Sequence, residues 1–351
     1  MSITRKASLW TEMKNVTIEN LHPTAAENTC ARAERGRAGM EENRFRLLRP
    51  VLRAALLPLV LAVMAVACSV QAGAQAPKGT SVLVPSAPGT TVCGNSKAGF
   101  DASNLSQGYI MAYYNVSKDK VKVQITGGGT TYTYNLNIGG RKEVLPLTMG
   151  SGSYTIAIYE RVTGNEYALA YQKQVSAKLD NAYLPFLYPN QYVNFSASSS
   201  VVAVAGNLAA GADDELGVIT NIYNYVTSSI SYDFGKANSA ASGQLAGYLP
   251  RVDNVLASGT GICFDYAAVM TAMLRSQQIP TRMEVGYVSN GAYHAWISTY
   301  IPETGWVDGV IQFDGKNWKL MDPTFASSGG GNPEIMQYIG NASNYQTKYR
   351  Y

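Results

Sequence analysis

A cysteine that follows two closely spaced glycines and opens an apolar helical segment constrains the fold of this chain more than any other feature. Gly259, Gly261 and Cys263 lead directly into FDYAAVMTAMLRSQ, a run of strong helix formers with apolar residues every three or four positions. The run stops at Ile279-Pro280, because proline disrupts a helix interior. We therefore predict a packed helix that carries Cys263 in its first turn.

A thiol in the first turn of a helix is placed where it can react. Unpaired backbone N–H groups at a helix N-terminus stabilise an anion, which lowers the pKa of a cysteine thiol and favours the thiolate. The same N–H groups can hold the oxyanion of a tetrahedral intermediate, and the glycines allow a substrate backbone to approach closely. A lone buried cysteine is more often an inert hydrophobe, so the prediction depends on the partners of Cys263.

Two residues further along the chain have the required chemistry. His294 lies in AYHAWI, which alternates like a strand, and the other histidine, His22, lies near the N-terminus. A nucleophilic thiol needs a base or ion-pair partner near pH 7, and histidine is the usual one. Asp322 follows a predicted strand over residues 318–321; it can orient the imidazole, although an aspartate before proline is commonly a turn former.

Four separated blocks resemble the transglutaminase-like family in order and in composition. They are GICFDYAAVMTAMLRSQQIPTRMEVGYV, YHAWISTY, GWV and WKLMDPTFA, and they cover about residues 213–326. Gln278 stands where that family more usually has glycine before Ile-Pro. The resemblance implies that Cys263 is the nucleophile, His294 the base and Asp322 the orienting acid.

The implied fold is a papain/transglutaminase-like α+β core, in which the helix that carries the cysteine packs against an antiparallel sheet. The implied activity is acyl transfer on protein or peptide amides through a cysteine thioester, as a transglutaminase, a deamidase or a peptidase. The alternative is a cell-surface binding or scaffolding lipoprotein whose transglutaminase-like domain is not catalytic. No cofactor is expected. A metal site built from Cys263, His294 and Asp322 is less favoured, because the helix-start cysteine and the order of the three explain them without a metal.

The first 67 residues have the features of a leader. An arginine-rich stretch over residues 44–53 precedes the apolar segment Ala54–Ala67, which is too short to span a bilayer comfortably and has the length of a signal-peptide core. We interpret residues 40–67 as a signal peptide and residues 1–39 as an upstream extension. The sequence therefore predicts export of the protein to the cell envelope.

Two modes of processing remain open. Ala65-Val66-Ala67-Cys68 resembles a bacterial lipobox, which would make Cys68 the lipidated, membrane-attached N-terminus. Cleavage after Ala72-Gly73-Ala74 would instead release a secreted protein. We favour the lipoprotein on the outer face of the cell membrane.

Charge and cysteine usage exclude other classes. Residues 1–67 hold ten Lys/Arg and six Asp/Glu, so the rest of the chain holds eighteen of each sign and has no cationic field for nucleic acid. Apart from Cys30 and Cys68, the cysteines are Cys93 and Cys263. A disulfide between them would disable the nucleophile, so we expect Cys263 to be free.

The remaining segments complete the predicted organisation. Residues 68–107 are rich in small and polar residues and are expected to be a flexible tether. Short runs dense in Tyr, Val, Ile and Thr, separated by turn signals, predict a small all-β sandwich-like domain over residues 108–176. A linker over residues 177–212, the catalytic domain over 213–326 and a tail over 327–351 follow.

Overall fold

The computed structural model of the chain describes residues 78–136, 140–302, 304–308, 311–313, 318–320, 322–324, 327 and 341–351. All of them belong to one of the two units into which contacts divide the chain, the unit formed by residues 1–24 and 74–351. The predicted leader and Cys68 lie outside the described residues.

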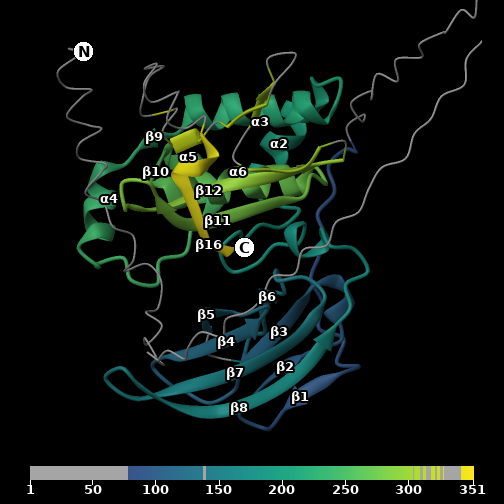
Figure 1. Ribbon diagram of the computed structural model, residues 1–351, viewed down its shortest axis with the longest axis vertical. Coiled ribbons are helices and arrows are strands. Elements are labelled where there is room, and N and C mark those ends of the chain that lie inside the picture. Colours follow the sequence, from purple (N-terminus) through teal and green to yellow (C-terminus); the bar gives the residue numbers. More distant parts are fainter. Residues whose placement is uncertain are drawn as a thin grey trace, which may run out of the picture. The chain divides into compact units, whose positions relative to one another are not determined.

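An all-β region comes first, as predicted, and consists of two four-stranded antiparallel sheets (Figure 1). One sheet has the order β1-β2-β3-β6 and the other β5-β4-β7-β8. Strand β4 shows why these segments form strands, since Val121, Val123 and Ile125 are buried and the residues between them are not. The strands are β1 Val92–Gly94, β2 Ala98–Asp101, β3 Tyr109–Tyr114, β4 Val121–Gly127, β5 Thr130–Leu136, β6 Glu143–Pro146, β7 Gly152–Thr163 and β8 Glu166–Ala177.

Strands β1 and β2 lie inside the segment that was expected to be a flexible tether, so the structure differs from the expectation there. Oδ1 of Asn95 accepts the backbone N–H groups of Lys97 and Ala98 and closes the turn between the two strands. Ala98 and Phe100 are fully buried in the core of the all-β region. Small and polar composition is common to tethers and to tight turns, and only the packing of Phe100 distinguishes the two here.

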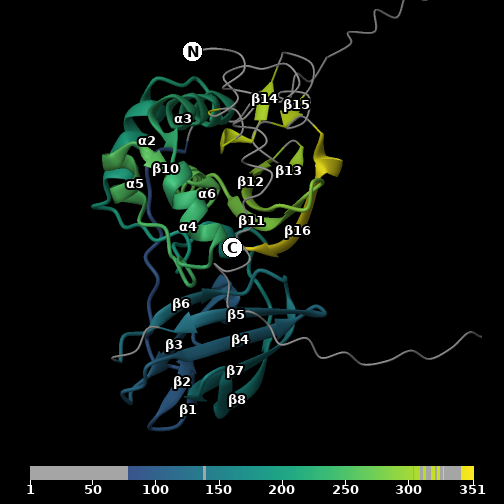
Figure 2. The same ribbon diagram turned by 90° about the vertical axis from the view of Figure 1, so that its left-hand side faces the viewer.

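The second part is built around α6, the helix predicted to carry the cysteine. It spans Cys263–Ser276 and all of its residues are buried, because α2, α3 and α5 contact it as well as β11 and β12 (Figure 2). The helices are α2 Ser200–Ala210, α3 Glu215–Ser229, α4 Phe234–Ala241 and α5 Val252–Ser258. The 3-10 turns are η2 Leu105–Gln107, η3 Leu184–Phe186 and η4 Ala342–Asn344.

A four-stranded antiparallel sheet with the order β13-β12-β11-β16 packs against α6. Its strands are β11 Thr281–Val288, β12 Tyr293–Ile301, β13 Gly305–Asp308 and β16 Tyr345–Arg350. Two small pairs accompany it, the parallel pair β9 Ser231–Tyr232 with β10 Thr260–Gly261 and the antiparallel pair β14 Ile311–Phe313 with β15 Trp318–Leu320. This arrangement confirms the predicted α+β core, with the cysteine helix against an antiparallel sheet.

The turn after α6 explains why glycine is more usual at position 278. Gln278 has φ of 62°, a left-handed conformation, and it is the one residue other than glycine with positive φ among those described. Glycine adopts that conformation without a steric penalty. Here the side-chain amide of Gln278 donates to the carbonyl of Ser81 at 2.6 Å, which anchors the segment before the first strand.

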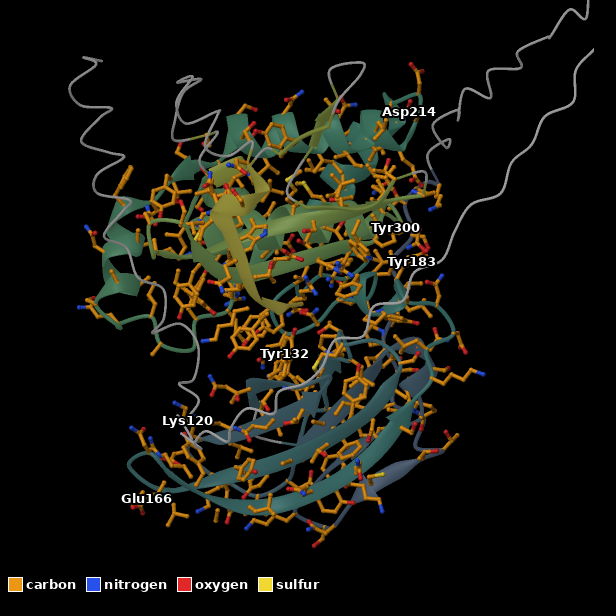
Figure 3. The ribbon with its side chains drawn as sticks, in the orientation of Figure 1. Lys120, Tyr132, Glu166, Tyr183, Asp214 and Tyr300 are labelled. Atoms are coloured by element: carbon orange, nitrogen blue, oxygen red, sulfur yellow. The ribbon has the colours of Figure 1, made fainter. Side chains whose placement is uncertain are left out.

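Segments expected to be linker and tail also contribute regular structure. Helix α2 lies within the predicted linker, and β16 of the predicted tail pairs with β11. Tyr183 and Tyr300 lie side by side (Figure 3), and their hydroxyls are 2.6 Å apart, which joins the linker to β12. The linker and the described part of the tail, residues 341–351, therefore belong to the packed structure.

Candidate active site

The three residues predicted to act together come from three different elements. Cys263 is the first residue of α6, His294 the second residue of β12, and Asp322 follows β15. All three are buried, with exposed fractions of 1%, 5% and 1%. The fold brings them to one place because β12 packs against α6.

His294 and Asp322 are directly hydrogen-bonded, with 2.6 Å between Nε2 of the imidazole and Oδ2 of the carboxylate. Asp322 is itself held in place, because its Oδ1 accepts the backbone N–H of Thr324 at 2.9 Å. The hydroxyl of Tyr345, on β16, donates to Oδ2 at 3.4 Å. The carboxylate is therefore oriented through both oxygens, which fixes the imidazole in turn.

The imidazole of His294 carries a raised pKa. Burial by itself lowers it, but the negative charges of Asp322 and Cys263 and hydrogen bonds to both side chains raise the pKa of His294 to about 10. With Nε2 engaged by Asp322, Nδ1 is the nitrogen that remains for the thiol. Cys263, His294 and Asp322 thus form one connected chain of side chains.

The start of α6 provides donors for an oxyanion. Cys263 occupies the first position of the helix, so its backbone N–H has no acceptor within the helix. Tyr232 lies beside this point, because β9 pairs with β10 and places Tyr232 opposite Gly261. Burial raises the pKa of Tyr232, and so does the nearby charge of Cys263, so the phenol remains a neutral donor.

Aromatic side chains form a wall of the site. Trp296 lies two residues beyond His294 on β12, and the two rings stack with 6.2 Å between centroids. Nε1 of Trp296 donates to Oε2 of Glu284 at 3.1 Å, and Tyr345 packs edge-on to the indole at 5.1 Å. This wall shields the imidazole from water and keeps its orientation fixed.

Three residues of the site are missed by sequence reasoning. Tyr345 contacts Asp322 from the predicted tail, and no local pattern there indicates it. Tyr223, on α3, has a buried hydroxyl with no hydrogen-bond partner among the described residues, and its pKa is raised by burial and by the charge of Asp322. Asp265 lies two residues after Cys263 on α6, and this closeness in the sequence is the signal that could have indicated it.

Both cysteines in the described part of the chain, Cys93 and Cys263, are free thiols, as predicted for Cys263. Within the same residues, no group of three or more His, Cys, Asp or Glu side chains is arranged to hold a metal ion.

Comparison with known protein families gives a match over part of the chain. Residues 202–309 match the model of the transglutaminase-like superfamily, a range that begins within α2, ahead of the predicted start at residue 213. No curated protein matches the sequence.

Solved structures similar to this chain include a candidate cysteine protease from Cytophaga hutchinsonii and the periplasmic domain of TgpA from Pseudomonas aeruginosa. The first is 13% identical with a TM-score of 0.35, covering 69% of this chain and 75% of that one. The second is 14% identical with a TM-score of 0.31, covering 71% and 99%. Since both scores lie below 0.5, the assignment depends on the family match and on the fold described above. The chain therefore carries, over residues 202–309, a domain of the transglutaminase-like superfamily.

Proposed function

We propose that this protein is a cysteine-dependent acyl-transfer enzyme that acts on protein or peptide amides, with Cys263 as nucleophile, His294 as acid and base, and Asp322 as orienting acid. One observation carries the proposal. A buried imidazole is held by Asp322 at 2.6 Å and is hydrogen-bonded to the thiol of Cys263, which opens a buried helix. A small inert cysteine would not require a charged and oriented imidazole beside it.

In the first half-reaction, the thiolate of Cys263 attacks the carbonyl carbon of an amide and a C–S bond forms. The electron pair of the C=O bond moves to oxygen, where the N–H of Cys263 and the hydroxyl of Tyr232 stabilise the charge. The tetrahedral intermediate collapses as His294 gives its proton to the departing nitrogen and the C–N bond breaks. A thioester on Cys263 and a free amine or ammonia result.

In the second half-reaction, water or a primary amine attacks the thioester. The now neutral His294 takes the proton of the attacking group, the C–S bond breaks, and the thiolate–imidazolium pair is restored. Asp322 stabilises the imidazolium whenever it forms. Peptidase, deamidase and transglutaminase activity share these steps and differ in the amide attacked and in the acceptor.

Export is part of the same proposal. The arginine-rich and apolar leader and the lipobox-like Cys68 support a protein attached to the outer face of the cell membrane, with cleavage after Ala74 and secretion as the alternative. Within the residues that the structure describes, no helix has the length and apolar character needed to cross a membrane. Mass spectrometry of the mature N-terminal peptide distinguishes a lipidated Cys68 from cleavage after Ala74.

The test is incubation of the protein with cell-envelope proteins and a fluorescent primary amine, followed by mass spectrometry. Amine incorporation, deamidation and cleavage give three distinct mass changes. We expect Cys263→Ala and His294→Ala to lower the rate by at least about 10³-fold. Cys93→Ala is the matched control, since Cys93 lies on β1 and belongs to no step.

Full-rate modification by Cys263→Ala would contradict the proposal. If wild type is inert towards all substrates and His294→Ala does not alter the labelling of Cys263 by a thiol probe, the non-catalytic binding or scaffolding protein becomes the better interpretation.

A further inference from the structure

A buried charged cluster lies two residues from Cys263 and is used by none of the steps above. Its centre is Asp265, which occupies the third position of α6 and is fully buried. Oδ2 of Asp265 accepts the backbone N–H of Ile262 at 2.9 Å and so satisfies an otherwise unpaired donor at the helix start. Gly261 allows this approach, because a Cβ atom there would lie 2.7 Å from Cβ of Asp265. Asp265 therefore fixes the backbone directly before the nucleophile.

Two other segments of the chain contribute partners to Asp265. Nζ of Lys236, on α4, lies 2.5 Å from Oδ2, and the hydroxyl of Tyr248 donates to Oδ1 at 2.6 Å. Nζ of Lys236 also donates to the Tyr248 hydroxyl at 2.6 Å and lies 4.2 Å from the centre of its ring. Burial and the charge of Asp265 raise the pKa of Tyr248, so the phenol stays neutral. Lys236 is thus the cation of the Lys236–Asp265–Tyr248 cluster.

The charge of Asp265 has a consequence for the nucleophile. The charges of Cys263 and Asp265 both raise the pKa of Tyr232, so the two groups lie in the same region. A carboxylate there opposes ionisation of the thiol, because the thiolate is a second negative charge. A neutral serine or asparagine side chain could satisfy a helix start without this effect. A buried carboxylate is also unfavourable unless it is paired. Both problems are removed if a positive charge stays beside Asp265.

We infer that Asp265 and Lys236 are positioning residues for Cys263: Asp265 holds the start of α6, and Lys236 cancels its charge so that the thiol can ionise. The inference rests on the proposed role of Cys263 as nucleophile. It predicts that removal of the Lys236 charge raises the pH at which Cys263 ionises and that removal of the Asp265 charge lowers it. Removal of both charges should leave that pH nearly unchanged.

The other ionisable groups near the thiol are the same in wild type and in variants that lack the charge of Lys236 or of Asp265. They are Tyr223 on α3, Tyr232 on β9, Tyr266 on α6, His294 on β12 and Asp322 after β15. His294 and Asp322 form their own hydrogen-bonded pair, and the three tyrosines remain neutral because burial raises their pKa.

The experiment measures the rate of iodoacetamide alkylation of Cys263 against pH in the full chain, with peptides resolved by mass spectrometry. The variants are Lys236→Met, Asp265→Asn and the double variant, and the peptide that contains Cys93 is the internal control. We expect the midpoint pH of the alkylation-rate profile of Cys263 to rise in Lys236→Met, so that alkylation is about tenfold slower at pH values below the midpoint. It should fall in Asp265→Asn and return close to the wild-type value in the double variant.

A purely structural cluster would give a different pattern. Both single variants would then slow alkylation in the same direction, and the double variant would be no better than either; that outcome overturns the inference. If Lys236→Met does not fold, as judged by circular dichroism, Asp265→Asn and the double variant decide, because a midpoint that rises in Asp265→Asn contradicts the inference.

A further control separates charge from hydrogen bonding. Tyr248→Phe removes two hydrogen bonds of the cluster, one to Asp265 and one from Lys236, without changing its charge, so the midpoint should stay close to that of wild type. Alkylation needs no substrate, so absence of amide-transfer activity would count against the proposed function while leaving this measurement decisive for the cluster.

Discussion

His294 shows how single residues set the chemistry of this site. Burial works against its positive charge, and the neighbouring carboxylate and thiol outweigh burial, so its pKa is raised to about 10. A histidine whose folded pKa lies above its unfolded value of 6.5 binds its proton more tightly in the folded state. The resulting stabilisation is complete below pH 6.5 and is lost as the pH rises through the folded value.

The first prediction concerns this titration. In Asp322→Asn, the pKa of His294 falls towards or below its usual value, because the main charge that opposes the effect of burial is gone. The measurement is the NMR shift of ¹³C-labelled histidine against pH, in a His22→Gln background that leaves one histidine. Tyr345→Phe removes the 3.4 Å contact to Asp322 but keeps the carboxylate, and it should shift the midpoint much less. Equal midpoints in wild type and Asp322→Asn would disprove the assigned cause.

The three neighbouring strands β12, β11 and β16 hold His294 in a sheet that depends on one close approach between backbone atoms at Gly286. On β11, Gly286 pairs with His294 of β12 on one side and with Thr347 of β16 on the other, next to an irregularity in the register. A Cβ atom at Gly286 would lie 2.0 Å from the backbone oxygen of Gln346. Backbone atoms cannot move aside as the end of a flexible side chain does, so the three strands fit together only around glycine.

The second prediction is therefore that Gly286→Ala displaces β16 and lowers the free energy of unfolding by about 3 kcal/mol, as overpacking does in a tight interior. Urea unfolding followed by tryptophan fluorescence gives the value. Gly211→Ala is the matched control, since a Cβ atom there meets nothing within 4 Å. If the two variants have the same free energy of unfolding, the close approach of β16 to Gly286 does not contribute to stability.

At the scale of the whole described molecule, one buried arginine joins segments that are distant in the sequence. Arg275 of α6 is fully buried and donates to the backbone carbonyls of Tyr188 at 2.7 Å, Thr281 at 2.8 Å and Tyr351 at 2.7 Å. Burial lowers its pKa to about 9. These carbonyls belong to the linker, the start of β11 and the end of the described chain, so a single side chain holds all three segments around α6.

The third prediction follows from those carbonyls. Arg275→Met leaves three buried acceptors without their donor and should lower the free energy of unfolding by about 3 kcal/mol or more. Arg251→Met is the control, because Arg251 is exposed, and we expect a change within about 0.5 kcal/mol. Denaturant unfolding measures both. A difference below about 1 kcal/mol between the variants would show that the carbonyls find other donors.

Much of the core was predictable because it is encoded in local patterns. The three- and four-residue spacing of apolar residues gave α6, and the glycines before it and Pro280 after it gave its boundaries. Alternation gave β12, and the position of Asp322 after a strand is confirmed. Local hydrogen bonding and side-chain period depend on near neighbours in the chain, so one sequence is sufficient to reveal them.

The sequence by itself determined which residues are candidates for catalysis and on which kinds of element they lie. Tertiary structure alone decided their surroundings: the Lys236–Asp265–Tyr248 cluster beside Cys263, the contact of Tyr345 with Asp322, and the strand pairing of β16. These features join residues far apart in the chain, and their energies arise from burial and charge that exist only after packing. The glycine-flanked cysteine thus predicts a reactive helix start, while the fold determines the charges that surround it.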